Sequence, residues 1–133
     1  MGGRPVRRLN PAQQMLALRA TFPGITGTAR RGVLNCIMSI RPSPVSQVYT
    51  VRILQQHGGR PQVTVIDPPL QLYPGATSLP HVYPDDELCL YYPGQWKPKM
   101  LLSTTIVPWT AEWLMHYELW LATGQWSGGG HGG

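Results

Sequence analysis

The chain contains two cysteines, Cys36 and Cys89, and the residues around them differ in kind. Cys36 alternates with apolar residues, so we expect a core thiol there, since cysteine is among the most often buried residue types. Cys89 lies in a segment rich in proline, tyrosine and aspartate without regular periodicity. Long segments of this kind are usually functional, and a thiol there can act as a nucleophile. Cys89 is the candidate reactive residue, with an incidental thiol as the competing interpretation. We expect the rigid, proline-rich backbone of this segment to hold Cys89 at the surface.

Three acidic residues, Asp85, Asp86 and Glu87, stand just before Cys89. Negative charge disfavours a thiolate, which argues against a protease-like cysteine of low pKa. Exchange of an acyl group between two thiols tolerates such surroundings better than hydrolysis, which needs a strong nucleophile and a placed base. We interpret Asp85 and Asp86 as groups that orient an acceptor amine.

Other residues of the same segment allow a chemical or a structural interpretation. His81, close to Tyr83, either supports chemistry at Cys89 or hydrogen-bonds a loop carbonyl. Trp96 is predicted to be a packing anchor under the segment rather than a catalytic group. Tyr83 is grouped with Trp96 as structural support.

The remaining histidines predict no metal site, and no cofactor is predicted. His57 falls in a glycine-containing turn, and His116 is expected at the surface or core edge of a helix. Neither has a second ligand at the spacing of a zinc site. No glycine-rich loop of the nucleotide-binding kind occurs, so any ATP-dependent activation would come from elsewhere.

A helix followed by a meander of strands is expected before this segment. Asn10 predicts the helix start, because a proline occupies the first helical position and a glutamine completes a capping box. The helix should end before Pro23. From Val33 to Ile66 apolar residues recur with period two, which predicts three antiparallel strands joined by turns. A short fourth strand is expected over residues 70–72.

A second helix is expected after the irregular segment, which covers residues 73–99. Pro108 can open this helix, and Trp113, Tyr117 and Trp120 then share one face. Gly124 can end it as a C-cap. Two helices around an antiparallel meander define an α+β fold.

Composition is consistent with one small folded domain. The 133 residues include 14 prolines and 15 glycines, with 13% charged and 42% hydrophobic residues. This excludes a disordered charged tail, a long coiled coil and an all-helical bundle. The N-terminal residues show neither a secretory signal nor a membrane segment, so a cytoplasmic protein with free thiols is expected.

The charges are divided between the two halves of the chain. All 6 acidic residues lie at or after Asp67, whereas most of the 11 basic residues are arginines between Arg4 and Arg60. A net charge of +5 allows nucleic-acid binding or an acidic partner surface. Basic and aromatic residues are not interleaved as in single-strand binders, so nucleic acid is the less favoured partner.

The order of helix, meander, cysteine-containing loop, tryptophan and helix resembles the fold of ubiquitin-conjugating (E2) enzymes. The motif residues that agree with that family are Pro80, Val82, Tyr83, Leu88, Cys89, Leu90, Trp96 and Pro98. The resemblance implies that Cys89 accepts the C-terminus of a partner as a thioester. His81 stands where the family has an asparagine that supports the oxyanion, and Leu79 where it has a histidine. The resemblance thus implies a supporting role for His81.

A closer resemblance is to the stand-alone E2-like proteins of bacterial antiphage CBASS operons. It rests on Pro80-His81, on Leu88-Cys89-Leu90, on residues 117–124, and on Trp126 with the glycine-rich residues after it. It implies a ubiquitin-conjugating-like domain over residues 1–126 and a flexible tail over 127–133. It also implies that the acyl group is the C-terminus of a cGAS-like nucleotidyltransferase, for transfer to a target protein or an acceptor lysine. The arginine-rich half would be a docking surface for protein partners.

Two alternatives remain open. The chain can be a non-catalytic E2-variant that binds protein, in which Cys89 is incidental. It can also be a basic nucleic-acid-binding domain, in which case binding should depend steeply on salt. The terminal Gly132-Gly133 looks like the end of a ubiquitin-like modifier, but we interpret it as part of the flexible tail.

Overall fold

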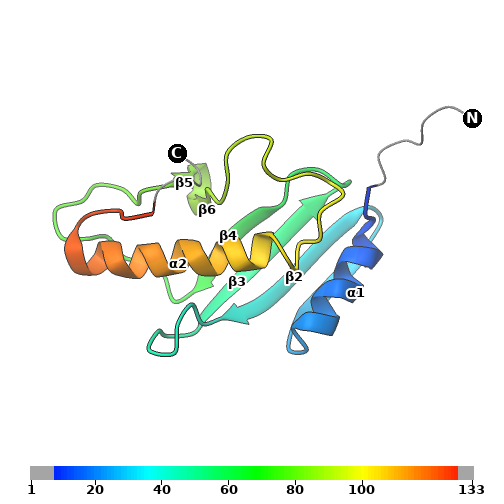
Figure 1. The fold of residues 1–133 in the computed structure, drawn as a ribbon, viewed down its shortest axis with the longest axis horizontal. Helices are drawn as coiled ribbons and strands as arrows, with labels where there is room; N and C mark the ends of the chain where they lie inside the picture. The colour runs from blue at the N-terminus through cyan, green and yellow to red at the C-terminus, as the bar shows by residue number, and fades with distance from the viewer. Residues whose placement is uncertain (1–7, 129–133) are drawn as a thin grey trace, which may run out of the picture.

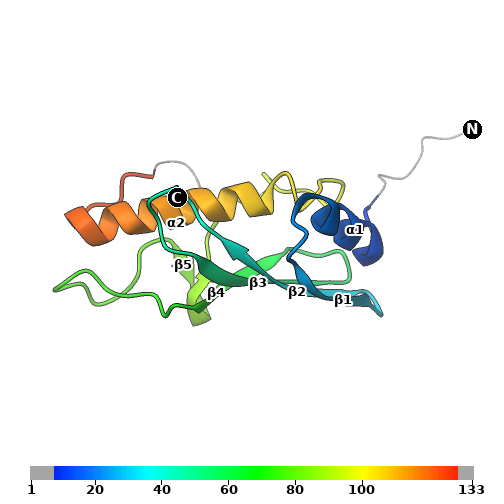
Figure 2. The same ribbon diagram turned by 90° about the horizontal axis from the view of Figure 1, so that it is seen from below.

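The computed structural model describes residues 8–128, which form one antiparallel sheet with both helices on the same side of it (Figures 1 and 2). The element order is α1, four strands, a small hairpin and α2. This is the α+β architecture that the sequence predicted, consistent with a ubiquitin-conjugating-like fold.

Helix α1 (Pro11–Thr21) begins at the predicted capping box. The Asn10 side chain accepts a hydrogen bond from the Gln13 backbone N–H at 2.8 Å, and the Gln13 side chain accepts one from the Asn10 N–H at 2.9 Å. Both bonds satisfy donors that a helix start leaves free. Met15 and Leu18 then face the sheet and are buried.

The sheet has the order β1 (Thr26–Arg30), β2 (Val33–Ile40), β3 (Tyr49–Gln56) and β4 (Gln62–Asp67). Each neighbouring pair is antiparallel. On β2 and β3 every second residue is buried under the helices, which is the pattern that period two predicted. Cys36, on that face, is fully buried.

One strand was assigned wrongly from the sequence. Residues 70–72 form no strand, and the fourth strand is β1, which precedes the predicted meander. The Gln71 backbone N–H instead donates to the Tyr117 hydroxyl at 2.7 Å. This segment therefore pairs with a side chain of α2 rather than with the edge of the sheet.

Helix α2 (Ile106–Thr123) lies across the sheet and covers most of its buried face (Figure 1). It starts slightly before the predicted Pro108, which the first turn tolerates. It ends at Gly124, a left-handed C-cap whose N–H donates to the Trp120 carbonyl, as predicted. The buried residues of α2 follow the spacing of one helix face: Ile106, Val107, Thr110, Trp113, Leu114, Tyr117 and Trp120.

The segment between β4 and α2 contains only short regular elements. Strands β5 (Val82–Tyr83) and β6 (Glu87–Leu88) form a hairpin and are joined by a 3-10 turn, η1 (Pro84–Asp86).

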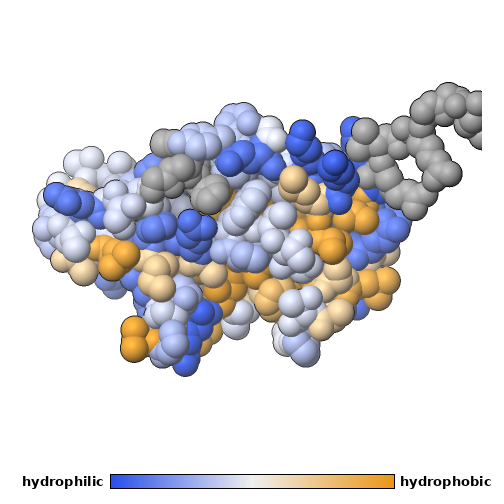
Figure 3. Space-filling view, viewed as in Figure 1, coloured by the Kyte–Doolittle hydropathy of each residue, from blue (hydrophilic) through white to orange (hydrophobic). Residues whose placement is uncertain are grey.

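The loop between β2 and β3 projects from the molecule with apolar surface at its tip, and Val45 in that loop is 95% exposed (Figure 3). The predicted tail is described only for Ser127 and Gly128, since residues 129–133 lie outside the described range.

Candidate active site

Cys89 directly follows β6, and its backbone N–H donates to the His81 carbonyl at 3.1 Å. Cys89 is only 6% exposed, so the expectation that the loop holds this residue at the surface is wrong. The neighbours Leu88 and Leu90 belong to the hydrophobic core, and the hairpin of β5 and β6 brings the Tyr83 hydroxyl to the thiol. The thiol is thus placed by a packed strand end rather than by an irregular loop.

His81 is fixed through its backbone as well as through its ring. Its carbonyl also accepts a hydrogen bond from Trp113 Nε1 at 2.9 Å, and its φ of 53° is left-handed. The imidazole stacks on Trp126 with ring centroids 4.8 Å apart. Its Nδ1 atom is buried and has no hydrogen-bond partner within residues 8–128. The His81 ring is therefore held by stacking on Trp126, and not by the hydrogen bond from Nδ1 to a loop carbonyl that the structural interpretation expected.

Tyr83 contacts the candidate nucleophile directly. Its hydroxyl is hydrogen-bonded to the Cys89 thiol, and this bond raises the pKa of Tyr83 by favouring the protonated phenol. The guanidinium of Arg60 lies over the Tyr83 ring, 5.2 Å from the centroid. Tyr83 therefore contacts the thiol through its hydroxyl and the positively charged guanidinium of Arg60 through the face of its ring.

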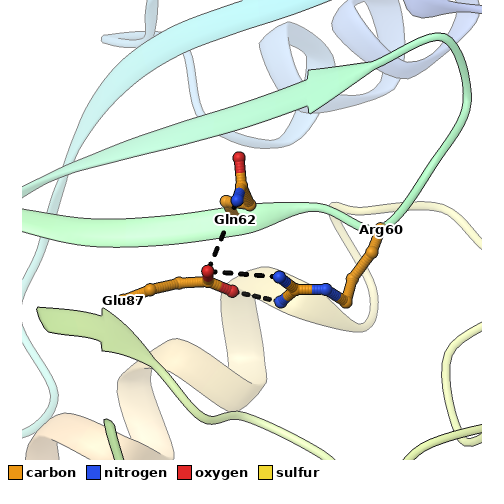
Figure 4. Close-up of polar contacts among 3 residues, drawn as sticks. All are labelled: Arg60, Gln62 and Glu87. Carbon is orange, nitrogen blue, oxygen red and sulfur yellow. Dashed lines mark hydrogen bonds and ion pairs between the residues drawn. The ribbon is translucent and has the colours of Figure 1, made fainter. Parts of the chain in front are cut away.

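Glu87 does not leave a free negative charge beside the thiol. Its carboxylate is almost fully buried and forms a bidentate ion pair with Arg60, as Figure 4 shows. Gln62 Nε2 donates to the same carboxylate at 3.4 Å. The hydrogen bonds with Glu87 raise the pKa of Arg60. The negative charge inferred for this position from the sequence is thus compensated by Arg60, which lies in the turn before β4.

Asp85 and Asp86 occupy the tip of the hairpin, and both side chains are exposed. Both have left-handed backbone conformations, with φ of 66° and 58°. Aspartate is among the residue types that adopt this conformation most readily outside glycine. Asp85 also lines a hollow of about 250 Å³ on the outer face of the sheet, together with Arg52 and Thr64. The two carboxylates are accessible to a partner molecule.

Trp96 is 7% exposed and belongs to the hydrophobic core. It also lines an open groove of about 430 Å³ with Arg60, Tyr91 and Arg8. This groove lies between the hairpin that joins β3 to β4 and the loop that follows Cys89. Burial in the core beneath that loop is the position expected of a packing residue.

Three residues at the site were missed in the sequence analysis: Arg60, Trp113 and Trp126. Arg60 follows a turn and had no motif to mark it, and Trp113 was identified only as a core residue of its helix. Trp126 was placed at the very end of the domain. The contact of its ring with His81 depends on a chain reversal after α2 that no local pattern predicts.

Residues 8–128 show no group of three His, Cys, Asp or Glu side chains that could hold a metal ion. Neither helix in this part of the chain is both long and apolar enough to cross a membrane.

A comparison with models of protein families gives a match for this chain. The sequence model of a family described as Type II CBASS E2 protein matches residues 14–133 of this chain. The match includes every residue of the candidate site, from Arg60 to Trp126. The comparison with curated proteins gave no significant match.

Proposed function

This chain belongs to the family of type II CBASS E2 proteins, and from that premise we propose that Cys89 carries the C-terminus of a partner protein as a thioester. The observation that supports this most is the surroundings of Cys89. The residue that stands at the E2 cysteine position follows the hairpin directly, is bonded through its backbone to His81, and has its thiol hydrogen-bonded to Tyr83. The chain would act as an E2-like acyltransferase in an antiviral system.

The reaction can be written as two exchanges at one carbonyl carbon. In loading, Cys89 Sγ attacks the activated C-terminal carbonyl of the partner, a new C–S bond forms, and the former leaving group departs with the thiol proton. In discharge, an amine or a second thiol attacks the same carbonyl, and the C–S bond to Cys89 breaks with return of a proton to sulfur. Both steps pass through an oxyanion that needs a hydrogen-bond donor.

We assign that donor role to the His81 ring N–H, and the orientation of an acceptor amine to Asp85 and Asp86. His81 supports this role by its fixed ring, which needs little reorganisation during the reaction. The two carboxylates support theirs by their exposure at the hairpin tip. Replacement of Asp85 and Asp86 by Asn is expected to slow discharge to an amine more than loading. Equal effects on both steps would contradict this assignment.

The proposed partner is a cGAS-like nucleotidyltransferase, which would present its C-terminus to Cys89, and the final acceptor is a target protein or a lysine. Arginines on the described surface, such as Arg19 and Arg31, would contribute to docking of these proteins. Since Cys89 is 6% exposed, docking must also open access to the thiol. We infer that the Cys89 thiol becomes reactive when the partner protein docks.

The test is intact mass spectrometry of the protein after co-expression with the partner, purified without reductant. We expect an adduct with the mass of the partner that thiols or hydroxylamine remove. Cys89→Ala should lose it, and Cys36→Ala, the matched control from the core, should keep it. If no adduct forms on Cys89 with the partner under any of these conditions, the enzymatic proposal is wrong.

The burial of Cys89 favours one second candidate, a protein-binding module without catalysis. In that case Cys89→Ala would bind the partner with unchanged affinity, and neither protein would gain mass. The same co-expression experiment, followed by size-exclusion chromatography, distinguishes the two functions.

A further inference from the structure

The chain reverses direction after α2 and packs back onto it. We call residues 124–128 the C-terminal strap. Gly124 makes the reversal in a left-handed conformation, and the Thr123 hydroxyl accepts a hydrogen bond from the Gln125 N–H at 3.1 Å. In Figure 1 the strap, coloured red, returns along α2 toward β5. It therefore runs from the end of α2 to the hairpin that positions Cys89.

Trp126 is the residue by which the strap is attached. Its ring contacts Trp113 and His116 of α2, with centroid distances of 5.4 Å and 5.8 Å, besides the closer stack on His81. Gly128 fits against the same cluster, since a Cβ there would lie 2.5 Å from a carbon of the His116 ring. The strap thus packs closely against α2 through Trp126 and Gly128.

The same cluster holds both ends of His81. Trp113 donates to the His81 carbonyl, while Trp126 covers the His81 ring. His81 needs such support, because a left-handed conformation is unfavourable for a residue other than glycine. Trp126 also lines one small cavity with Leu90, the neighbour of Cys89. Movement of Trp126 would therefore affect His81 and Leu90, the residue next to Cys89.

We infer that Trp126 is a positioning residue, which holds the His81 ring and the backbone around Cys89 in place. The ring contacts that define this role are those with His81, Trp113 and His116. The effect of Trp126 on acyl transfer rests on the proposed function, but its effect on His81 and on access to Cys89 does not. The inference therefore has a structural part and a kinetic part that can fail separately.

The structural part is tested with Trp126→Ala, with Trp126→Phe, and with Leu119→Ala as control, since Leu119 is exposed on α2 outside the cluster. Two readouts are needed. One is the ring-proton NMR shift of His81, which stacking on Trp126 moves upfield. The other is the rate at which iodoacetamide modifies each cysteine, mapped by mass spectrometry.

We expect Trp126→Ala to abolish the upfield shift, which establishes that the stack exists in solution. We expect it also to raise the alkylation rate of Cys89 by roughly five- to thirtyfold, which corresponds to a local destabilisation of about 1–2 kcal/mol and tests the positioning role. Trp126→Phe, which keeps a ring, should give smaller changes, and Leu119→Ala none. Cys36 reports global unfolding, because it is fully buried on the sheet. An unchanged His81 shift in Trp126→Ala, or an equal rise at Cys36 and Cys89, would overturn the inference.

The kinetic part uses the thioester. In Trp126→Ala we expect discharge to an amine to slow by about tenfold, with Trp126→Phe restoring most of the rate. A wild-type discharge rate in a variant that has lost the His81 shift would refute the role in transfer. If the wild-type protein forms no thioester at all, the proposed function fails, while the NMR shift and the alkylation rates still decide whether Trp126 positions the loop.

Discussion

Glu87 and Arg60 show how one ion pair sets the electrostatics beside the thiol. The Glu87 side chain is 10% exposed, whereas the Arg60 side chain is 48% exposed. Removal of a partner from a buried charge costs more than removal of a partner from a charge that water can reach. The two partners of this pair are therefore not equivalent.

We predict that Arg60→Ala destabilises the protein by about 2 kcal/mol and Glu87→Gln by about 1 kcal/mol. In Arg60→Ala a buried carboxylate loses its charge partner, whereas in Glu87→Gln the arginine turns to solvent. The measurement is urea unfolding at pH 7, and Arg52→Ala, an exposed arginine on β3, is the control. Equal losses for the two substitutions would mean that solvent compensates both charges equally.

At the scale of single residues, the sequence predicted the environment of Cys36 but not that of Cys89. Cys36 was predicted as a core thiol, and it is fully buried with its pKa raised by burial to about 11. Cys89 was expected at the surface and is buried, because the short hairpin pairs in a way that its proline and aspartate residues do not signal. The contact of Glu87 with Arg60 joins distant segments, and no local pattern predicts such a pair.

Among the elements, those with strong periodicity were predicted well. The alternation of β2 and β3 and the apolar face of α2 each define one buried side, and the N-cap of α1 and the C-cap of α2 follow from residue types. Strand β1 was missed, since its sequence Thr-Gly-Thr-Ala-Arg is polar and short of apolar alternation. An edge strand buries little, so its sequence carries little signal.

Gly27 gives a test of how β1 joins the sheet. Its φ is 142°, and a Cβ at this position would lie 2.3 Å from the carbonyl oxygen of Asn35 on β2. We predict that Gly27→Ala destabilises the protein by at least about 2 kcal/mol, because the backbone must change and the strand must move away. Thermal unfolding followed by circular dichroism measures the loss.

Gly24→Ala is the matched control for this substitution. Gly24 precedes the same strand, and a Cβ there has open space around it. We expect its effect to stay within about 0.5 kcal/mol. If both substitutions were equally mild, close contact between β1 and β2 at Gly27 would not be required for the fold.

Across the whole molecule, the site is assembled from three layers of the chain. β4 and the turn before it supply Gln62 and Arg60, the hairpin supplies Tyr83 and Glu87 and leads into Cys89, and α2 with its strap fixes His81. The hairpin and the segment after it carry the E2 motif residues, and the last turns of α2 with Trp126 carry part of the closer resemblance. Arg60 and Trp113 reach the site only through tertiary packing, which explains why Cys89, His81 and Tyr83 were identified as candidates from the sequence and these two residues were not.

A cysteine thiol and several tyrosine hydroxyls in and around the core make the fold sensitive to alkaline pH. Burial raises the pKa of Cys36 from 9.0 to about 11 and that of Tyr91 from 10.0 to about 12. Burial also raises the pKa of Tyr49 and of Tyr117. In each case the folded protein keeps a proton that the unfolded chain gives up at lower pH.

The sign of the effect follows from this difference in bound protons. Below pH 9 the folded and the unfolded state both hold the Cys36 proton, so the thiol does not lower the free energy of unfolding. From pH 9 to 11 only the folded state holds this proton, so the free energy of unfolding falls as pH rises. We predict that the free energy of unfolding of the wild type falls more steeply than that of Cys36→Ala across this range, by up to about 1.4 kcal/mol per pH unit. Urea unfolding at several pH values measures both slopes. Because the buried tyrosines remain in both proteins, the difference isolates the thiol, and parallel slopes would show that Cys36 does not couple its ionisation to folding.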